Sequence, residues 1–293
     1  MNKTTSESER LQWPAELSAY PMGFEANEGL RSIFIRNLTL QQLGRSVTAS
    51  LTEESSSPTI PKVLMQYWHD SSDIPADVRA CLDSWNALKD YGFGFRLFND
   101  ATATAYIADK YGHQESKAFA LCRHPAMRSD YFRMCFMLAE GGLYVDADDV
   151  LLGDRWKVMF RNDRLKLQPL CYDIPAGGML LASKIWDSDL PTEGRVFYVN
   201  NDPIVAPAGH PIIERALLRS TKMLLSDDLS HEIQSTTGPG NLTTSLAAHA
   251  RELIIAGCDP DFELLDNWDT IAEMRWHLSY RSDSRNWRNV YGC

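Results

Sequence analysis

Apolar and polar residues follow two different periods along the chain from about residue 60 onwards. Residues 62–68 (KVLMQYW) and 93–98 (FGFRLF) form short apolar runs, which are typical of buried strands. Between them, residues 76–89 place three apolar side chains on one face at helical spacing. The pattern therefore predicts strand, helix and strand over this stretch.

Further helices and a third strand follow. Asn99 or Asp100 can cap a helix that ends near residue 112, and a longer helix over 125–140 stops at two glycines. Residues 143–145 then form a short buried strand. Strands that alternate with helices in this way predict an α/β fold, with a parallel sheet covered by helices on both faces.

The first 58 residues form a separate compositional zone. Residues 30–43 (LRSIFIRNLTLQQL) have the spacing of a short amphipathic helix, and residues 46–58 are rich in Ser, Thr and Glu, as linkers are. We expect an N-terminal helical extension with a linker over residues 1–58, followed by one α/β domain over residues 59–293.

The composition is that of a globular protein, with 44% apolar and 23% charged residues. The 29 basic and 39 acidic residues give a net charge of −10, which argues against the basic face that nucleic-acid binding requires. The six cysteines include no Cys-x-x-Cys pair, so we expect buried, reduced thiols. No secretory signal or transmembrane segment is visible, so we expect a cytoplasmic protein, or an effector secreted by a non-classical route.

An acidic cluster lies directly after the third predicted strand, within residues 141–150 (GGLYVDADDV). Ligands of open α/β sheets bind at the carboxyl ends of the strands, so the cluster is placed where a site belongs. Asp146 and Asp148 are one residue apart and can face one hard cation. Mg²⁺ and Mn²⁺ take such oxygen ligands and keep positions open for substrate phosphates. A solvated turn is the alternative for these two aspartates taken alone.

The helix before this motif carries a charged pair beside its apolar stripe. Asp130 and Arg133 lie three residues apart and therefore neighbour each other on the helix. We regard them as candidates to bind a nucleotide donor, and an ordinary surface ion pair is the alternative.

Several stretches carry a likeness to known enzymes: residues 60–68 (IPKVLMQYW), Ser84-Trp85, residues 129–148 (SDYFRMCFMLAEGGLYVDAD) and, more weakly, residues 201–211 and 237–239. Together they resemble the DXD-containing glycosyltransferase family 32 and the related glucosyltransferase domains of the large clostridial toxins. The likeness is good over residues 60–150 and patchy from there to about residue 288.

The resemblance implies a GT-A fold, a Rossmann-like nucleotide-sugar-binding domain, over residues 59–293. It implies a hexosyltransferase that moves a hexose from a nucleotide diphosphate sugar with retention of the anomeric configuration, and with Mn²⁺ or Mg²⁺ as cofactor. A UDP-sugar is the preferred donor, because the spacing from Asp-x-x-Arg to Tyr-x-Asp-x-Asp follows the toxin-like pattern. The acceptor is expected to be a glycan, a protein or a small molecule.

The resemblance also implies roles for single residues. Asp148 would ligate the metal directly, and Asp146 would lie by the metal, the ribose or the donor sugar. Asp130 would bind sugar hydroxyls and Arg133 the donor, which makes these four the candidate catalytic residues. Further donor contacts are expected from Gln66, Trp68, Ser129, Tyr144, Asn200, Asn201, Ser284 and Trp287. For the two asparagines, which follow a predicted strand, a plain turn is the alternative.

Residues 275–293 (RWHLSYRSDSRNWRNVYGC) contain four arginines and one acidic residue. Arginine pairs with phosphate oxygens, so this segment suits a lid over a diphosphate, with a solvated tail as the alternative. Within it, His277 is the candidate for a further metal ligand. The family's closing Ser-Trp reads Asn286-Trp287 here, which leaves Ser284 as the nearest serine. The family's opening His-Gln-x-Trp reads Met-Gln-Tyr-Trp over residues 65–68.

Two other functions fit parts of the sequence. Residues 143–152 (LYVDADDVLL) match the Asp-x-Asp-x-Val signature of HAD-type phosphatases, in which Asp146 would be the nucleophile, although some 140 residues precede the motif here. A non-catalytic nucleotide-sugar-binding protein is the second alternative. A Ca²⁺-binding EF-hand is excluded, because the sixth and twelfth positions from Asp146 are Leu151 and Lys157.

Overall fold

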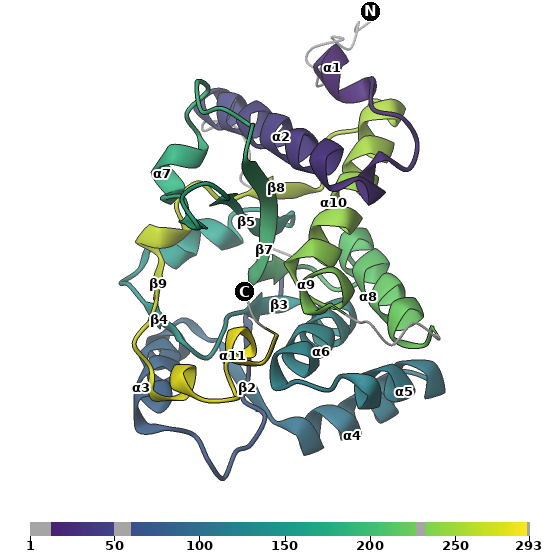
Figure 1. Ribbon diagram of the computed structural model, residues 1–293. Coiled ribbons are helices and arrows are strands. Elements are labelled where there is room, and N and C mark those ends of the chain that lie inside the picture. The colour runs from purple at the N-terminus through teal and green to yellow at the C-terminus, as the bar shows by residue number, and fades with distance from the viewer. Residues whose placement is uncertain (1–12, 50–59, 227–231, 292–293) are drawn as a thin grey trace, which may run out of the picture.

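The computed structural model describes residues 13–49, 60–226 and 232–291, and a mixed β-sheet runs through its centre (Figure 1). The strands follow the order β2-β1-β3-β7-β5-β6, and β8 pairs with β5. Their bounds are β1 Val63–Tyr67, β2 Gly94–Phe98, β3 Gly142–Tyr144, β5 Leu165–Asp173, β6 Gly178–Met179, β7 Arg195–Ala206 and β8 Phe262–Leu264. The predicted α/β class is confirmed.

Only part of the sheet is parallel, which corrects the expectation of a fully parallel sheet. Strand β1 pairs in parallel with β2 and β3, as the alternation of strands and helices predicted. Strand β7 runs antiparallel to both β3 and β5. The chain passes from β5 to β7 through β6 and the four-residue helix α7 (Ala182–Ile185), whereas a parallel crossover requires a longer, usually helical connection.

Three helices next to the parallel strands lie close to the predicted positions: α3 Ala76–Ser84, α4 Asp100–Lys110 and α6 Pro125–Ala139. Helix α5 (His113–Leu121) was not predicted. The predicted helix over 76–89 changes to a 3₁₀ helix at Trp85. Asn99 is the cap of α4, because its side chain accepts a 2.9 Å hydrogen bond from the amide of Thr102. Helix α6 lies within the core and carries ten buried residues from Met127 to Met137.

Two glycines bring the acidic motif beside β1. Gly141 and Gly142 follow α6 with positive φ angles of 68° and 115°. A Cβ atom on Gly142 would lie 2.5 Å from the carbonyl oxygen of Val63, and one on Gly141 would lie 2.6 Å from the amide nitrogen of Ala208. Glycine permits this close approach, so β3 pairs with β1 and the chain delivers Asp146 just past the carboxyl end of the strand.

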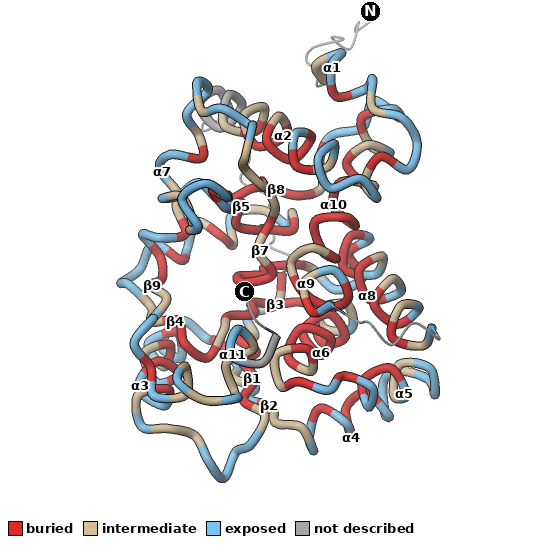
Figure 2. The backbone as a smooth tube through the Cα atoms, viewed as in Figure 1, coloured by how far each residue is buried: buried red, intermediate tan, exposed pale blue. Residues whose placement is uncertain are grey.

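The two faces of the sheet bury different sets of side chains, since neighbouring residues of a strand point to opposite faces. Tyr144 packs with α6, α8 (Pro211–Leu224) and α10 (Pro239–Ala256), whereas its neighbour Leu143 packs with Trp85 and Trp156. A small sheet of β4 (Asp149–Leu151) and β9 (Ala272–Met274) lies beside this second cluster. Figure 2 shows the buried positions concentrated along β3, α6 and α10.

The described part of the N-terminal extension packs onto the same core. It contains α1 (Ala15–Ser18) and α2 (Glu28–Ala49), and α2 is longer than the predicted helix over 30–43. Phe34, Ile35 and Leu38 of α2 are fully buried in the main cluster. Helix α2 also includes residues 46–49 of the expected linker, and the rest of that linker lies outside the described residues. The boundary at residue 58 stays a prediction.

Two other expectations concern the whole chain. Within the described residues, no helix has both the length and the apolar character needed to cross a membrane. The five described cysteines have free thiols: Cys81, Cys122, Cys135 and Cys171 are buried, and Cys258 is exposed, which corrects the expectation of burial for that residue. Cys293 lies outside the described residues.

Candidate active site

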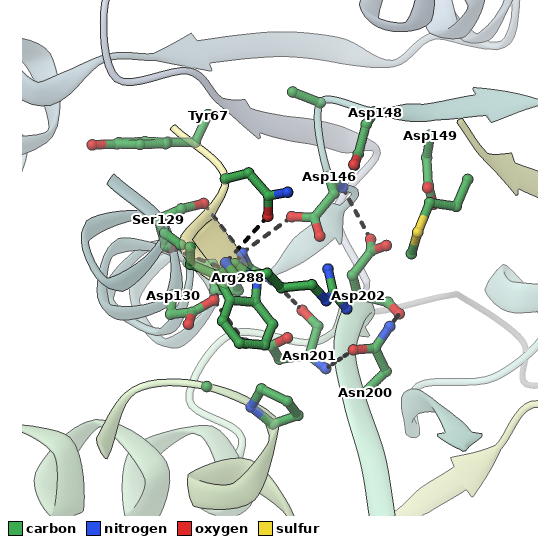
Figure 3. Close-up of a pocket in the computed structure, with 18 of the residues that line it drawn as sticks. Tyr67, Ser129, Asp130, Asp146, Asp148, Asp149, Asn200, Asn201, Asp202 and Arg288 are labelled. Carbon is green, nitrogen blue, oxygen red and sulfur yellow. Dashed lines mark hydrogen bonds and ion pairs between the residues drawn. The ribbon is translucent and has the colours of Figure 1, made fainter. Parts of the chain in front are cut away.

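A cavity of about 400 Å³ opens where the sheet changes from parallel to antiparallel pairing. Its walls come from the ends of β1 and β3, from α6, from β7 and from C-terminal residues 276–288. Figure 3 shows Ser129 and Asp130 reaching in from α6 and residues 200–202 from β7, with Asp146 between them. The structure therefore brings together residues that are up to about 220 positions apart in the sequence.

Arg133 is the centre of a buried charged network. Its Nη2 lies 3.0 Å from Asp130 Oδ1 and 3.1 Å from Asp146 Oδ1, and its Nη1 donates to the carbonyl of Asn201 at 2.7 Å. The guanidinium also lies 4.1 Å from the ring centre of Tyr144. Burial opposes the charge, but the surrounding acidic groups raise the pKa of Arg133, so the guanidinium is a permanent cation.

The alternative of a surface ion pair is wrong for Asp130 and Arg133, since they are only 7% and 3% exposed. Asp130 accepts hydrogen bonds from Asn201 Nδ2 at 2.9 Å and from Thr237 Oγ1 at 3.4 Å. Burial raises the pKa of Asp130 to about 6, and the nearby guanidinium only partly opposes this. A carboxylate of this kind at a cavity wall is well placed to accept hydrogen bonds from sugar hydroxyls.

Each carboxylate of the Asp-Ala-Asp motif has its own arginine. Asp146 accepts hydrogen bonds from Arg133 and from the Tyr144 hydroxyl. Asp148 accepts a hydrogen bond of 2.8 Å from the Tyr280 hydroxyl and forms an ion pair with Arg281. Burial and the charge of Asp146 raise the pKa of Asp148, while Arg281 opposes that rise.

Two further carboxylates lie at the site: Asp149, which belongs to the predicted acidic cluster but was given no role, and Asp202, which was not assigned to the site from the sequence. They are 0% and 1% exposed, and Asp202 Oδ1 accepts a 3.0 Å hydrogen bond from the amide of Asp146. Burial, and then the carboxylates around them, raise the pKa of both residues well above the usual range. A proton held by Asp149 and shared with Asp202 satisfies two oxygens that otherwise lack a partner. The sequence feature that could have indicated Asp202 is the run of polar residues 200–202 inside an otherwise apolar strand.

The oxygen-rich donor set fits a hard divalent cation. With the proton on Asp149, four carboxylates at this end of the sheet remain: Asp130, Asp146, Asp148 and Asp202. They outnumber the two guanidinium groups that pair with the motif, those of Arg133 and Arg281, which leaves an excess of negative charge around the motif. Among the described residues, no three His, Cys, Asp or Glu side chains converge as a complete metal shell. Asp146 and Asp148 are the groups that would hold the cation, with diphosphate and water oxygens completing its shell, as Mg²⁺ commonly binds.

Four expected site residues do not line the cavity. Gln66 and Tyr144 are buried, and Tyr144 reaches the site only through its hydroxyl, 3.1 Å from Ser129 Oγ. Ser284 is exposed, and its carbonyl lies 3.0 Å from His124 Nε2. His277 is also exposed, although Trp276 and Tyr280 on either side of it line the cavity. The geometry therefore gives no support to His277 as a metal ligand or to Ser284 and Gln66 as donor contacts.

The other expected donor contacts do line the cavity: Trp68, Ser129, Asn200, Asn201 and Trp287. The indole Nε1 of Trp68 donates to the carbonyl of Asp73 at 2.9 Å, which fixes the ring at the cavity edge. Asn200 and Asn201 lie within β7, so the alternative of a plain turn is wrong. Arg288, which Figure 3 also labels, lines the same cavity.

The C-terminal segment is folded against the rest of the protein, so the alternative of a solvated tail is wrong. The amide and hydroxyl of Ser279 donate to the carboxylate of Asp77 on α3, at 2.6 and 3.0 Å. The amide of Arg275 donates to the carbonyl of Asp148 at 2.9 Å. Figure 1 shows the segment running from β9 past β4 and α3 to α11 (Trp287–Tyr291). The segment thus supplies Tyr280 and Arg281, whose contacts were not predicted.

Comparison with known proteins finds a related family for part of the chain. Residues 61–165 match the family described as "Glycosyltransferase sugar-binding region containing DXD motif". This stretch contains β1, α6, β3 and the Asp146–Asp148 motif, so the match covers one wall of the cavity. This part of the chain is similar to the DXD-containing glycosyltransferase region, which confirms the resemblance seen in the sequence. The β2-β1-β3 arrangement confirms the α/β part of the expectation, and the GT-A type of fold stays a prediction.

Two individual proteins are also similar. The chain is 24% identical over 284 residues to the initiation-specific alpha-1,6-mannosyltransferase of Saccharomyces cerevisiae, covering 86% of this chain and 54% of that protein. The chain thus spans about half the length of this curated relative. A solved structure, the PaToxG glycosyltransferase, aligns with a TM-score of 0.41 and 14% identity over 90% of this chain and 98% of that one.

Proposed function

We propose that this protein transfers a hexose from a nucleotide diphosphate sugar to an acceptor hydroxyl, with a divalent cation held by Asp146 and Asp148. The observation that carries the proposal is the buried Asp130–Arg133–Asp146 network in the cavity wall, within the segment that matches the glycosyltransferase family. Removing these charged groups from water costs several kcal/mol. Charged groups held in this way beside a cavity are typical of functional sites, and a charged ligand is the binding partner that would explain their position.

The donor is proposed to lie along the wall formed by α6 and the ends of β1, β3 and β7. Trp68 at the cavity edge would stack on the base, as flat aromatic rings do. Asp130 and Asn201, which bond each other at 2.9 Å, would hydrogen-bond the hydroxyls of the sugar. A bound Mn²⁺ or Mg²⁺ would neutralise the charge that builds up on the departing diphosphate. The permanent charge of Arg133 supports the same step without any movement of protons.

We propose that the transfer proceeds with retention of configuration, as the resemblance implies, and without a covalent enzyme intermediate. Asp130 and Asp146 are both bound to Arg133, and a carboxylate held in an ion pair is a weak nucleophile. We therefore propose that the acceptor attacks on the face that the diphosphate leaves, and that a diphosphate oxygen takes the acceptor proton.

The acceptor is proposed to enter along the opposite wall, whose side chains come from β5, β6, β7 and β9. They combine apolar and aromatic surface with a few hydrogen-bonding groups: Gln168, Leu170, Met179, Tyr198, Met274 and Trp276. Such a mixture suits a hydroxyl-bearing glycan, protein segment or small molecule.

The test is a donor screen with Mn²⁺ and UDP-glucose, UDP-galactose, UDP-N-acetylglucosamine and GDP-mannose. We expect one UDP-sugar to raise the melting temperature and to be cleaved, with free UDP and an α-hexose as the first products in an NMR time course. Release of the β-hexose first would contradict retention. Binding without any released nucleotide would favour the non-catalytic alternative, and an acyl phosphate trapped on Asp146 would favour the phosphatase.

A further inference from the structure

Arg133 and Arg281, the two arginines that pair with the Asp-Ala-Asp motif, differ in how many partners hold them. Arg133 has hydrogen-bond or ion-pair partners on three elements, α6, β7 and the end of β3. The Arg281 side chain forms an ion pair with one residue only, Asp148, and its buried Nε has no partner among the described residues. A single carboxylate, that of Asp148, therefore holds the Arg281 guanidinium in place.

The surroundings of Arg281 allow its head group to move while its backbone stays in place. Its carbonyl accepts hydrogen bonds from the side chains of Asn286 at 2.9 Å and Asn289 at 3.0 Å, which fix the main chain. The guanidinium lies 4.8 Å from the ring centre of Trp276 and 5.5 Å from that of Tyr280. Flat aromatic surfaces of this kind hold an arginine without fixing its direction.

The position of this guanidinium conflicts with a cation on the same carboxylate. Arg281 Nη2 and the Tyr280 hydroxyl both bond the same atom, Asp148 Oδ2. A divalent cation bound to that oxygen would meet a positive charge already in contact with it. Because like charges repel strongly in a buried site, Arg281 and the cation compete for Asp148.

We infer that Arg281 takes the place of the divalent cation on Asp148 in the ligand-free protein, and that it transfers to the diphosphate oxygens when cation and nucleotide bind together. The inference rests on the proposed function and adds that the cation and the nucleotide bind cooperatively. Cation alone must displace Arg281 without offering it a new partner, so it binds weakly. A diphosphate supplies oxygens that pair with arginine in a forked geometry, so nucleotide and cation strengthen each other's binding.

The test is titration of Mn²⁺ alone, and of Mn²⁺ in the presence of saturating UDP, followed by electron paramagnetic resonance of free Mn²⁺. For the wild type we expect UDP to strengthen Mn²⁺ binding at least about a hundredfold. Arg281→Ala should bind Mn²⁺ alone at least about tenfold more tightly than the wild type, and UDP should strengthen its Mn²⁺ binding at least about tenfold less. Arg281→Gln keeps a hydrogen-bonding side chain without the charge, and should behave like Arg281→Ala.

Arg275→Ala is the matched control, because Arg275 is in the same segment but pairs with Glu273, and both side chains are about half exposed. It should titrate like the wild type. The tryptophan fluorescence of the wild type gives a second readout, since Arg281 is one of two arginines at the Trp276 ring and leaves it when it moves, whereas Arg288 is the other. At a Mn²⁺ concentration too low to bind without UDP, Mn²⁺ with UDP should change the emission and Mn²⁺ alone should not.

If both Arg281 variants bind Mn²⁺ alone no more tightly than the wild type, the inference is overturned while the metal-dependent transferase stands. If UDP does not strengthen Mn²⁺ binding to the wild type, the inference is overturned too. If neither the wild type nor any variant binds Mn²⁺, with or without UDP, both the inference and the proposed metal dependence are wrong.

Discussion

The guanidinium of Arg133 lies 3.1 Å from the carboxylate of Asp146, and this contact ties the middle of α6 to the carboxyl end of β3. The two residues come from elements that the same pair of glycines connects. The network thus serves both the fold and the site, and its removal has consequences for both.

Replacing Arg133 with alanine leaves Asp130 and Asp146 without their cation. Breaking a buried pair costs about 3–5 kcal/mol, so Arg133→Ala should lower the free energy of unfolding by that amount in a urea titration. Arg215→Ala is the control, because Arg215 pairs with Glu252 at 2.7 Å on the exposed surface, where a pair contributes about 0–1 kcal/mol. Equal effects of the two substitutions would show that the buried network does not stabilise the fold.

The raised pKa of Asp130, about 6, makes stability depend on pH. The folded pKa lies above the unfolded value of 3.8, so the group favours the folded state at low pH. This contribution is present below about pH 4 and is lost as the pH rises through about 6, by roughly 3 kcal/mol in total. The stability of the wild type relative to Asp130→Asn should therefore fall between pH 4.5 and pH 7, as measured by urea unfolding. A constant difference would mean that Asp130 ionises normally.

Asp149 and Asp202 provide a test of the shared proton. Asparagine has the shape of a protonated carboxyl group and can donate to Asp202 in its place. Asp149→Asn should therefore change the free energy of unfolding at pH 7 by less than about 1 kcal/mol. Asp149→Ala removes the donor and leaves a cavity, so it should cost at least about 2 kcal/mol. Strong destabilisation by the asparagine variant would indicate that Asp149 is ionised.

The close approach of Gly142 to the β1 backbone predicts that a side chain at this position destabilises the fold by steric clash, independently of the charged network. Gly142→Ala places a Cβ atom 2.5 Å from the Val63 carbonyl oxygen at a φ of 115°, and should cost at least about 2 kcal/mol in thermal or urea unfolding. Gly178→Ala is the control, since its Cβ would meet no atom within 4 Å. A Gly142→Ala protein as stable as the control would show that β3 can shift away from β1.

Local patterns predicted the part of the site that lies on consecutive elements. The apolar stripe of α6, the glycine stop and the acidic residues after β3 are close in sequence, so periodicity and spacing place them together. The start of α4 was predicted from a local pattern too, with Asn99 or Asp100 as the cap, and the hydrogen bond from the Thr102 amide identifies Asn99.

The remaining contacts join residues that no local pattern connects. Arg281 and Asp148 are 133 positions apart, and Asp202 and Asp146 are 56 apart. Helical spacing brought Asp130 and Arg133 together but could not show that α8, α10 and β7 enclose α6, so their burial was missed. The antiparallel half of the sheet was missed because the alternation of strands and helices was traced only as far as residue 145, and β5 and β7 lie beyond that point.

The central claim is that Asp148 holds the cation that makes donor cleavage possible. The most direct measurement is UDP release from the cleaved UDP-sugar with Mn²⁺, for the wild type and for Asp148→Asn, with Asp154→Asn as an exposed control. We expect Asp148→Asn to release UDP at least about a hundredfold more slowly, or ~2.7 kcal/mol of barrier, and EDTA to stop the wild type and the control alike. Wild-type turnover by Asp148→Asn, or turnover that survives EDTA, would contradict the account.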